Sequence, residues 1–142
     1  MRRLAGLLTA ALLLLGLSAC GQAGGEEDAF TVDIVCESEG LVQIFYSCYI
    51  GGEYRGMGGI ADLDGAVIEG GRVFSLVFSR NFFEEGDDPA QFSLTLSPYG
   101  EGDTQEIATT QPVEVPAQYG GHYTLVFSGD REGGFAAGLR EE

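Results

Sequence analysis

Apolar residues recur at every second position from Ala29 onward, and this spacing is typical of β-strands, not of helices. The clearest case is residues 91–97, where Phe92, Leu94 and Leu96 alternate with glutamine, serine and threonine. No segment after Ala29 has helical spacing in its sequence, and turn-forming residues separate the apolar runs. The pattern predicts an all-β domain, a small β-sandwich of seven or eight antiparallel strands.

Several segments are less regular. Residues 41–50 are apolar on both faces, as expected for a central strand. Residues 51–59 contain five glycines, so they form either an irregular edge strand or a loop. Residues 104–110 and 111–115 are weak strand candidates interrupted by a proline, and residues 122–127 are expected to form the last strand.

The first twenty residues have the features of a secretory leader. Two arginines at positions 2 and 3 precede an uncharged apolar run over residues 4–17. A membrane-spanning helix needs about 20 apolar residues, so this run is short for one. The run ends in Leu17-Ser18-Ala19-Cys20, which resembles the lipobox of bacterial lipoprotein precursors. The alternatives are an ordinary signal peptide cut after Ala19 and an uncleaved N-terminal anchor.

The lipoprotein resemblance implies cleavage before Cys20 and attachment of lipid to its sulfur, with two or three acyl chains for stable anchoring. It divides the chain into a signal peptide (residues 1–19), a lipidated flexible tether (residues 20–29) and a β-sandwich domain (residues 30–142). Gly21 stands where an aspartate would mark retention at the inner membrane. We therefore expect the protein to be located in the bacterial cell envelope, anchored to the outer membrane if the host has one and otherwise to the outer face of the cytoplasmic membrane.

The charge balance limits the range of partners. Without residues 1–19, the chain has 22 acidic and five basic side chains, a formal charge of −17, and it contains no lysine. Such a surface repels phosphates, which excludes nucleic acid as a partner. The charge serves solubility, or it attracts a basic partner by accelerating encounter. With the expected anchor at Cys20, it predicts a binding or structural module that contacts an envelope protein or an extracellular ligand.

Cys36 and Cys48 remain once Cys20 is assigned to lipid, and an even pair in an oxidising compartment predicts a disulfide. Strand geometry raises a conflict. If residues 37–40 form a hairpin turn, Cys48 lies about 20 Å further along the second strand than the position opposite Cys36. A disulfide requires Cα atoms within about 7 Å of each other, so the bond needs a displaced turn or a broken strand.

Acidic residues gather in the expected loops, which makes a calcium or small-ligand site the second functional hypothesis. The candidate ligands are Asp62, Asp64, Asp87 and Asp88, because calcium takes six to eight oxygen ligands from flexible loops. Residues 60–71 do not fit an EF-hand loop, since isoleucine and glycine occupy its first and last ligand positions. Turns also favour aspartate for purely local reasons. No other cofactor is expected.

The sequence argues against an enzyme. His122 is the single histidine, and with lysine absent the commonest proton-transfer groups are scarce. We expect His122 to face outward. Among the aromatic residues, Phe82 and Phe83 cannot both face inward in a regular strand, so one of them should be covered by a loop or exposed for a partner. Five tyrosines scattered through strands and turns are candidates for either the core rim or a binding surface.

One corner is more specific. Gly121-His122-Tyr123, after a short strand and a proline, resembles the tyrosine corner of immunoglobulin-like sandwiches, in which the tyrosine hydroxyl bonds back to the preceding turn. The chain departs from that family because it has no tryptophan and has Leu125, not cysteine, two positions after the tyrosine. A simple hairpin is the alternative.

Overall fold

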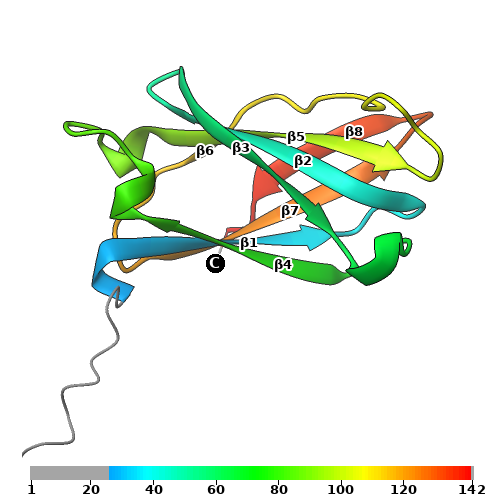
Figure 1. Ribbon diagram of the computed structural model, residues 1–142, viewed down its shortest axis with the longest axis horizontal. Coiled ribbons are helices and arrows are strands. Elements are labelled where there is room, and N and C mark those ends of the chain that lie inside the picture. The colour runs from blue at the N-terminus through cyan, green and yellow to red at the C-terminus, as the bar shows by residue number, and fades with distance from the viewer. Residues whose placement is uncertain (1–25, 142) are drawn as a thin grey trace, which may run out of the picture.

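The computed structural model describes residues 26–141 and is a β-sandwich, as predicted (Figure 1). Its eight strands are β1 (Ala29–Cys36), β2 (Leu41–Ile50), β3 (Glu53–Ala61), β4 (Arg72–Ser79), β5 (Phe92–Gly100), β6 (Val113–Val115), β7 (His122–Asp130) and β8 (Gly134–Leu139). They form two four-stranded sheets, with strand orders β4-β1-β7-β8 and β3-β2-β5-β6. We call these the first and the second sheet.

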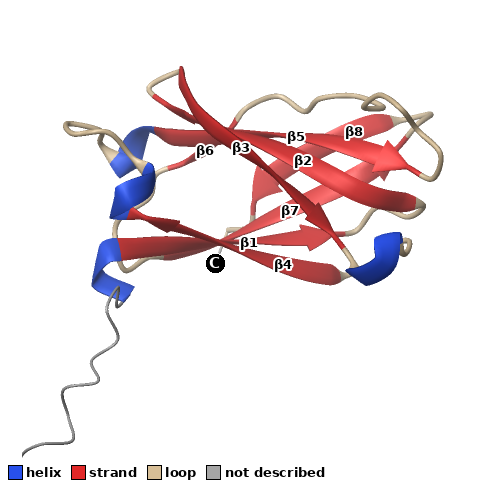
Figure 2. Cartoon of the chain, in the orientation of Figure 1, coloured by secondary structure: helices blue, strands red, loops and turns tan. Residues whose placement is uncertain are grey.

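Helical structure in the described part of the chain is limited to four short 3-10 turns (Figure 2). These are η1 (Glu26–Asp28), η2 (Leu63–Gly65), η3 (Arg80–Phe82) and η4 (Pro89–Gln91). The predicted tether, residues 20–29, reaches into this region, since η1 and the start of β1 both belong to the folded body. Cys20 and the rest of the leader lie outside the described residues.

Alternating burial along the strands builds the core. In β1, Phe30, Val32, Ile34 and Cys36 are all buried, and β5 alternates in the same way along its whole length. The ring of Phe30 contacts five other aromatic rings, which joins the two sheets at one end of the sandwich. Burying apolar side chains between two sheets is the main source of stability for such a domain.

The strand pairing differs from the all-antiparallel expectation at one place. β1 and β7 are neighbours in the first sheet and run parallel, with Thr31 opposite His122 and Cys36 opposite Phe127. Both strands begin at the same end of the molecule, and the intervening strands bring the chain back to that end before β7 starts (Figure 1). All the other neighbouring strands are antiparallel.

Three local expectations are decided by the structure. The glycine-rich residues 51–59 supply most of β3, an edge strand, so that alternative is correct. Residues 104–110 contain no strand, and the chain ends with β8, which the sequence analysis missed because its glycines and alanines carry little apolar signal. Phe82 and Phe83 both pack against the core, because the strand stops at Ser79 and η3 turns both rings inward.

The predicted tyrosine corner is present. The backbone N–H of Gln118 donates a hydrogen bond to the Tyr123 hydroxyl at 2.8 Å. A Cβ atom on Gly121 would lie 2.5 Å from that hydroxyl, so only glycine allows the turn to approach the ring this closely. The sequence Gly-x-Tyr therefore fixes how the chain enters β7.

The alternation of strand direction sorts the loops into two ends (Figure 1). The tether end, where β1 begins, is formed by residues 51–52, 80–91 and 116–121. The far end is formed by residues 37–40, 62–71, 101–106 and 131–133, together with Asp130 at the end of β7.

Candidate functional site

The far end of the sandwich carries a large group of acidic side chains. Eight of its ten acidic residues are exposed, and the other two are half-buried. The ten are Glu37, Glu39, Asp62, Asp64, Glu69, Glu101, Asp103, Glu106, Asp130 and Glu132. The loops of four different connections contribute them, so the cluster exists only in the folded chain.

Among the described residues, Arg131 lies at the far end and Arg72 lies beside it, and both are engaged by neighbouring carboxylates. Arg72 contacts Asp62 at 3.0 Å, and Arg131 bonds to Asp103. The backbone N–H of Gly100 also donates to Asp103, and these contacts lower the pKa of that carboxyl. The remaining carboxylates face water, so the end presents a strongly negative potential that attracts cations and basic groups.

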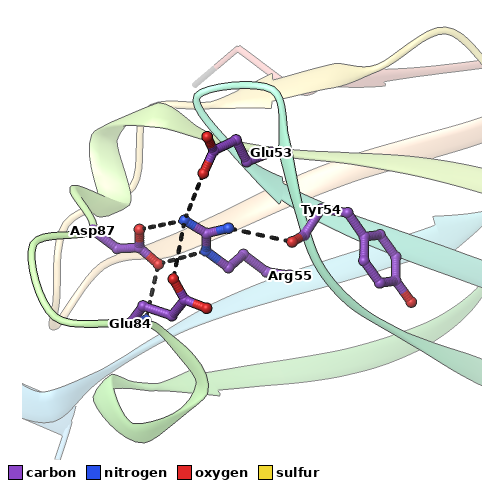
Figure 3. A network of polar contacts seen from close by, with 5 residues as sticks. All are labelled: Glu53, Tyr54, Arg55, Glu84 and Asp87. Carbon is purple, nitrogen blue, oxygen red and sulfur yellow. Dashed lines mark hydrogen bonds and ion pairs between the residues drawn. The ribbon is translucent and has the colours of Figure 1, made fainter.

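The tether end is held by an arginine network (Figure 3). Arg55 donates two parallel hydrogen bonds to Asp87, each at 2.8 Å, and contacts Glu53 at 3.3 Å and Glu84 at 3.7 Å. The side chains of Arg55 and Asp87 are 11% and 8% exposed, whereas both glutamates are largely exposed. The bidentate geometry fixes the loop of residues 84–88 against strand β3.

The charge of Arg55 changes the titration of its partner. The guanidinium, together with the backbone N–H of Glu84, lowers the pKa of Asp87 to about 2. Asp87 in turn raises the pKa of Arg55. The pair therefore stays ionised across the physiological pH range, and we assign it a structural role because its oxygens are already hydrogen-bonded.

The structure does not bring the four predicted calcium ligands together. Asp62 and Asp64 follow β3 at the far end, whereas Asp87 and Asp88 lie in the loop at the tether end. Three of the four have other partners: Asp62 bonds Arg72, Asp87 bonds the arginine of β3, and Asp88 accepts the N–H of Ala90. Within residues 26–141, no group of three or more possible metal ligands is present.

The predicted disulfide is wrong, because Cys36 and Cys48 are both free and buried. Cys36 ends β1 in the first sheet, at the far end. Cys48 lies near the end of β2 in the second sheet, about 20 Å along that strand from the turn. Because β1 and β2 lie in different sheets, residues 37–40 are not the hairpin turn assumed in the geometric objection. The cysteines stay apart because β2 carries Cys48 away from the end at which Cys36 lies. Burial raises the pKa of Cys36, and that of Cys48 to about 12, so both thiols are unreactive.

His122 faces outward, as expected, and has a partner that the sequence analysis missed. Its Nε2 lies 2.6 Å from Asp33 Oδ2, and the Ser75 hydroxyl donates to the other oxygen of the same carboxylate. Partial burial would raise the pKa of Asp33, but the bonds from Ser75 and His122 lower it. The carboxylate stands between the serine and the histidine, so this is not the serine–histidine order that activates a nucleophile.

A shallow groove of about 1200 Å³ lies on the outer side of the second sheet near the tether end. Tyr49, Ser93 and Glu114, which are cross-strand neighbours, line it together with Gln91. None of the described residues that line the groove is basic. Tyr54 is the most exposed tyrosine, at 56%, and the other five tyrosines are half-buried.

Comparisons with known proteins add little. No family model matches the chain, and no curated protein matches it. A solved structure titled "Trapped Toxin" is similar over 81% of the chain, with 12% sequence identity and a TM-score of 0.32. The chain spans 23% of that structure's length, and a similarity this low carries no argument about function. Among residues 26–141, no helix has the length and apolar character needed to cross a membrane.

Proposed function

We propose that this chain is a lipid-anchored, acidic binding module of the bacterial envelope, without catalytic activity. What supports the proposal is the relation between the two ends of the sandwich. The chain enters the fold at the tether end, where Arg80 contacts Asp28 at 3.2 Å beside the start of β1. The ten acidic side chains of the far end lie at the opposite end of the strands.

This arrangement suits a protein held at a surface by its N-terminus. A lipid on Cys20 followed by a short tether would keep the tether end near the membrane and leave the far end free to contact a partner. The negative potential of that end favours basic ligands and slows the approach of anionic ones. The partner proposed is therefore a basic envelope protein or a basic extracellular ligand.

The anchor is tested by feeding labelled palmitate to cells that express the full chain. The wild-type chain should incorporate the label and separate with the membrane fraction, whereas a Cys20→Ala variant should do neither. The Cys36→Ala variant is a matched control that keeps Cys20. Equal labelling of wild type and Cys20→Ala would contradict the proposal.

The binding surface is tested with a fluorescent lysine octapeptide and the folded domain. Binding should weaken strongly between about 0.02 M and about 0.3 M salt, because screening shortens the range of surface charges. The double variant Glu37→Gln/Glu132→Gln at the far end should bind more weakly than the matched variant Glu27→Gln/Glu85→Gln at the tether end. Equal weakening by the two variants would show that the far end is not the binding surface.

A further inference from the structure

The two sheets have four edge strands, and three of them carry features that block further strand pairing. β6 has only three residues, and prolines flank it on both sides. β3 is interrupted by a β-bulge and contains three glycines. β8 has six residues and contains glycine at two positions. Short length, bulges, prolines and glycines are the devices by which proteins protect sheet edges.

β4 lacks all of these devices. It pairs with β1 over eight consecutive residues without a register shift, and β1 is its single neighbour in the described part of the chain. Residues 73–79 contain no charge, glycine or proline. Val73 and Val77 point outward and are 43% and 66% exposed. An edge of this length offers a row of unpaired backbone N–H and C=O groups beside an apolar surface.

We propose that β4 is a docking edge, at which an extended and positively charged segment of a partner protein adds as a further strand of the first sheet. This mode of recognition gains affinity from backbone hydrogen bonds and specificity from alternate side chains. The outward side chains of the added strand would lie beside Val73 and Val77, so apolar residues are expected at every second position. The positive charge of the partner rests on the proposed function. The new element is the way in which the partner is held, by strand addition at β4.

The charge of the chain favours a cationic segment over a second copy of this chain. Two copies without residues 1–19 would each bring a formal charge of −17 and repel. Antiparallel pairing of two β4 strands would also place the two tether ends about 25 Å apart along the strand direction, facing opposite ways. A cationic segment is attracted instead by the net negative charge of the domain. At the edge itself, Arg72 and Arg80 are paired with Asp62 and Asp28, and Glu69 is exposed beside the start of β4.

The test uses the folded domain and an eight-residue peptide of alternating lysine and valine, which matches the length of β4. The Val77→Lys variant places a charge on the exposed face of the edge strand. Its matched control is Val67→Lys, an identical change at a valine that is 45% exposed in the β3–β4 loop. Val77→Lys should weaken binding about tenfold or more, and Val67→Lys less than about twofold.

Two further measurements distinguish strand addition at the β4 edge from binding by simple charge attraction. A peptide of the same sequence with every second amide N-methylated cannot complete the backbone hydrogen bonds, so it should bind far more weakly. Hydrogen exchange should show new protection of amides in residues 73–79 when the unmodified peptide is added. Equal binding of both peptides, or of both lysine variants, would overturn the docking edge and leave the proposed function standing. No binding of either peptide to the wild-type domain would overturn both.

Discussion

One side chain explains why position 58 is a glycine, and replacing this glycine provides a quantitative test of the packing. In β3, Gly58 is the cross-strand partner of Tyr46 in β2. A Cβ atom added at Gly58 would lie 2.3 Å from the Tyr46 hydroxyl oxygen, 2.5 Å from Cζ and 2.9 Å from Cε1. Ordinary contacts are about 3.5 Å, so a Gly58→Ala substitution forces the tyrosine ring to move by about 1 Å.

The size of the effect follows from two opposing contributions. Overpacking of this kind destabilises a protein by about 1–3 kcal/mol. Replacing glycine by alanine within a strand restores roughly 0.5–1 kcal/mol, because alanine loses less backbone entropy on folding. We therefore expect Gly58→Ala to destabilise the wild-type domain by about 1–2 kcal/mol. In a Tyr46→Ala background, where no ring opposes the methyl group, the same change should be stabilising by about 0.5 kcal/mol.

The assay is a double-mutant cycle measured by urea unfolding. The coupling free energy between Gly58→Ala and Tyr46→Ala should be about 2 kcal/mol. Tyr46→Phe is the control: it should relieve little of the cost, because two ring carbons remain within 3 Å of the added methyl group. A coupling near zero, or full relief by Tyr46→Phe, would refute the explanation.

Three other predictions follow from the site. Asp87→Asn should make the loop of residues 84–88 sensitive to proteases at pH 7. The wild-type loop should loosen only as the pH falls from about 4 toward the Asp87 pKa of about 2, because a carboxyl group with a lowered pKa stabilises the fold at every pH above its ordinary pKa and loses that contribution as it is protonated. Cys36 and Cys48 should resist a thiol reagent in the native domain and both react after unfolding in urea; a melting temperature lowered by reductant would contradict the free thiols. Tyr123→Phe should cost about 1 kcal/mol in thermal unfolding, because the Gln118 N–H loses its acceptor but can still reach water.

The sequence by itself determined which side chains face inward along the regular strands. Strand periodicity depends on the residues of one segment, so the alternation in β1 and β5 was enough to place their buried faces. The tyrosine corner was also readable, because its hydrogen bond closes within five residues, from Gln118 to Tyr123. The all-β class followed from the same local patterns.

Only the tertiary structure decided features that depend on residues far apart in the chain. Residues 53–59 belong to β3, and side chains from elsewhere fill the space beside their glycines: Phe82 at Gly56, Tyr46 at Gly58 and Phe45 at Gly59. Asp87 pairs with Arg55 across 32 positions, and Asp33 with His122 across 89, so no local pattern announces either pair. The strand directions likewise decided that the two cysteines stay apart and that ten carboxylates meet at the far end. Local preference sets the direction in which a side chain points, whereas its neighbours are set by where the other strands end.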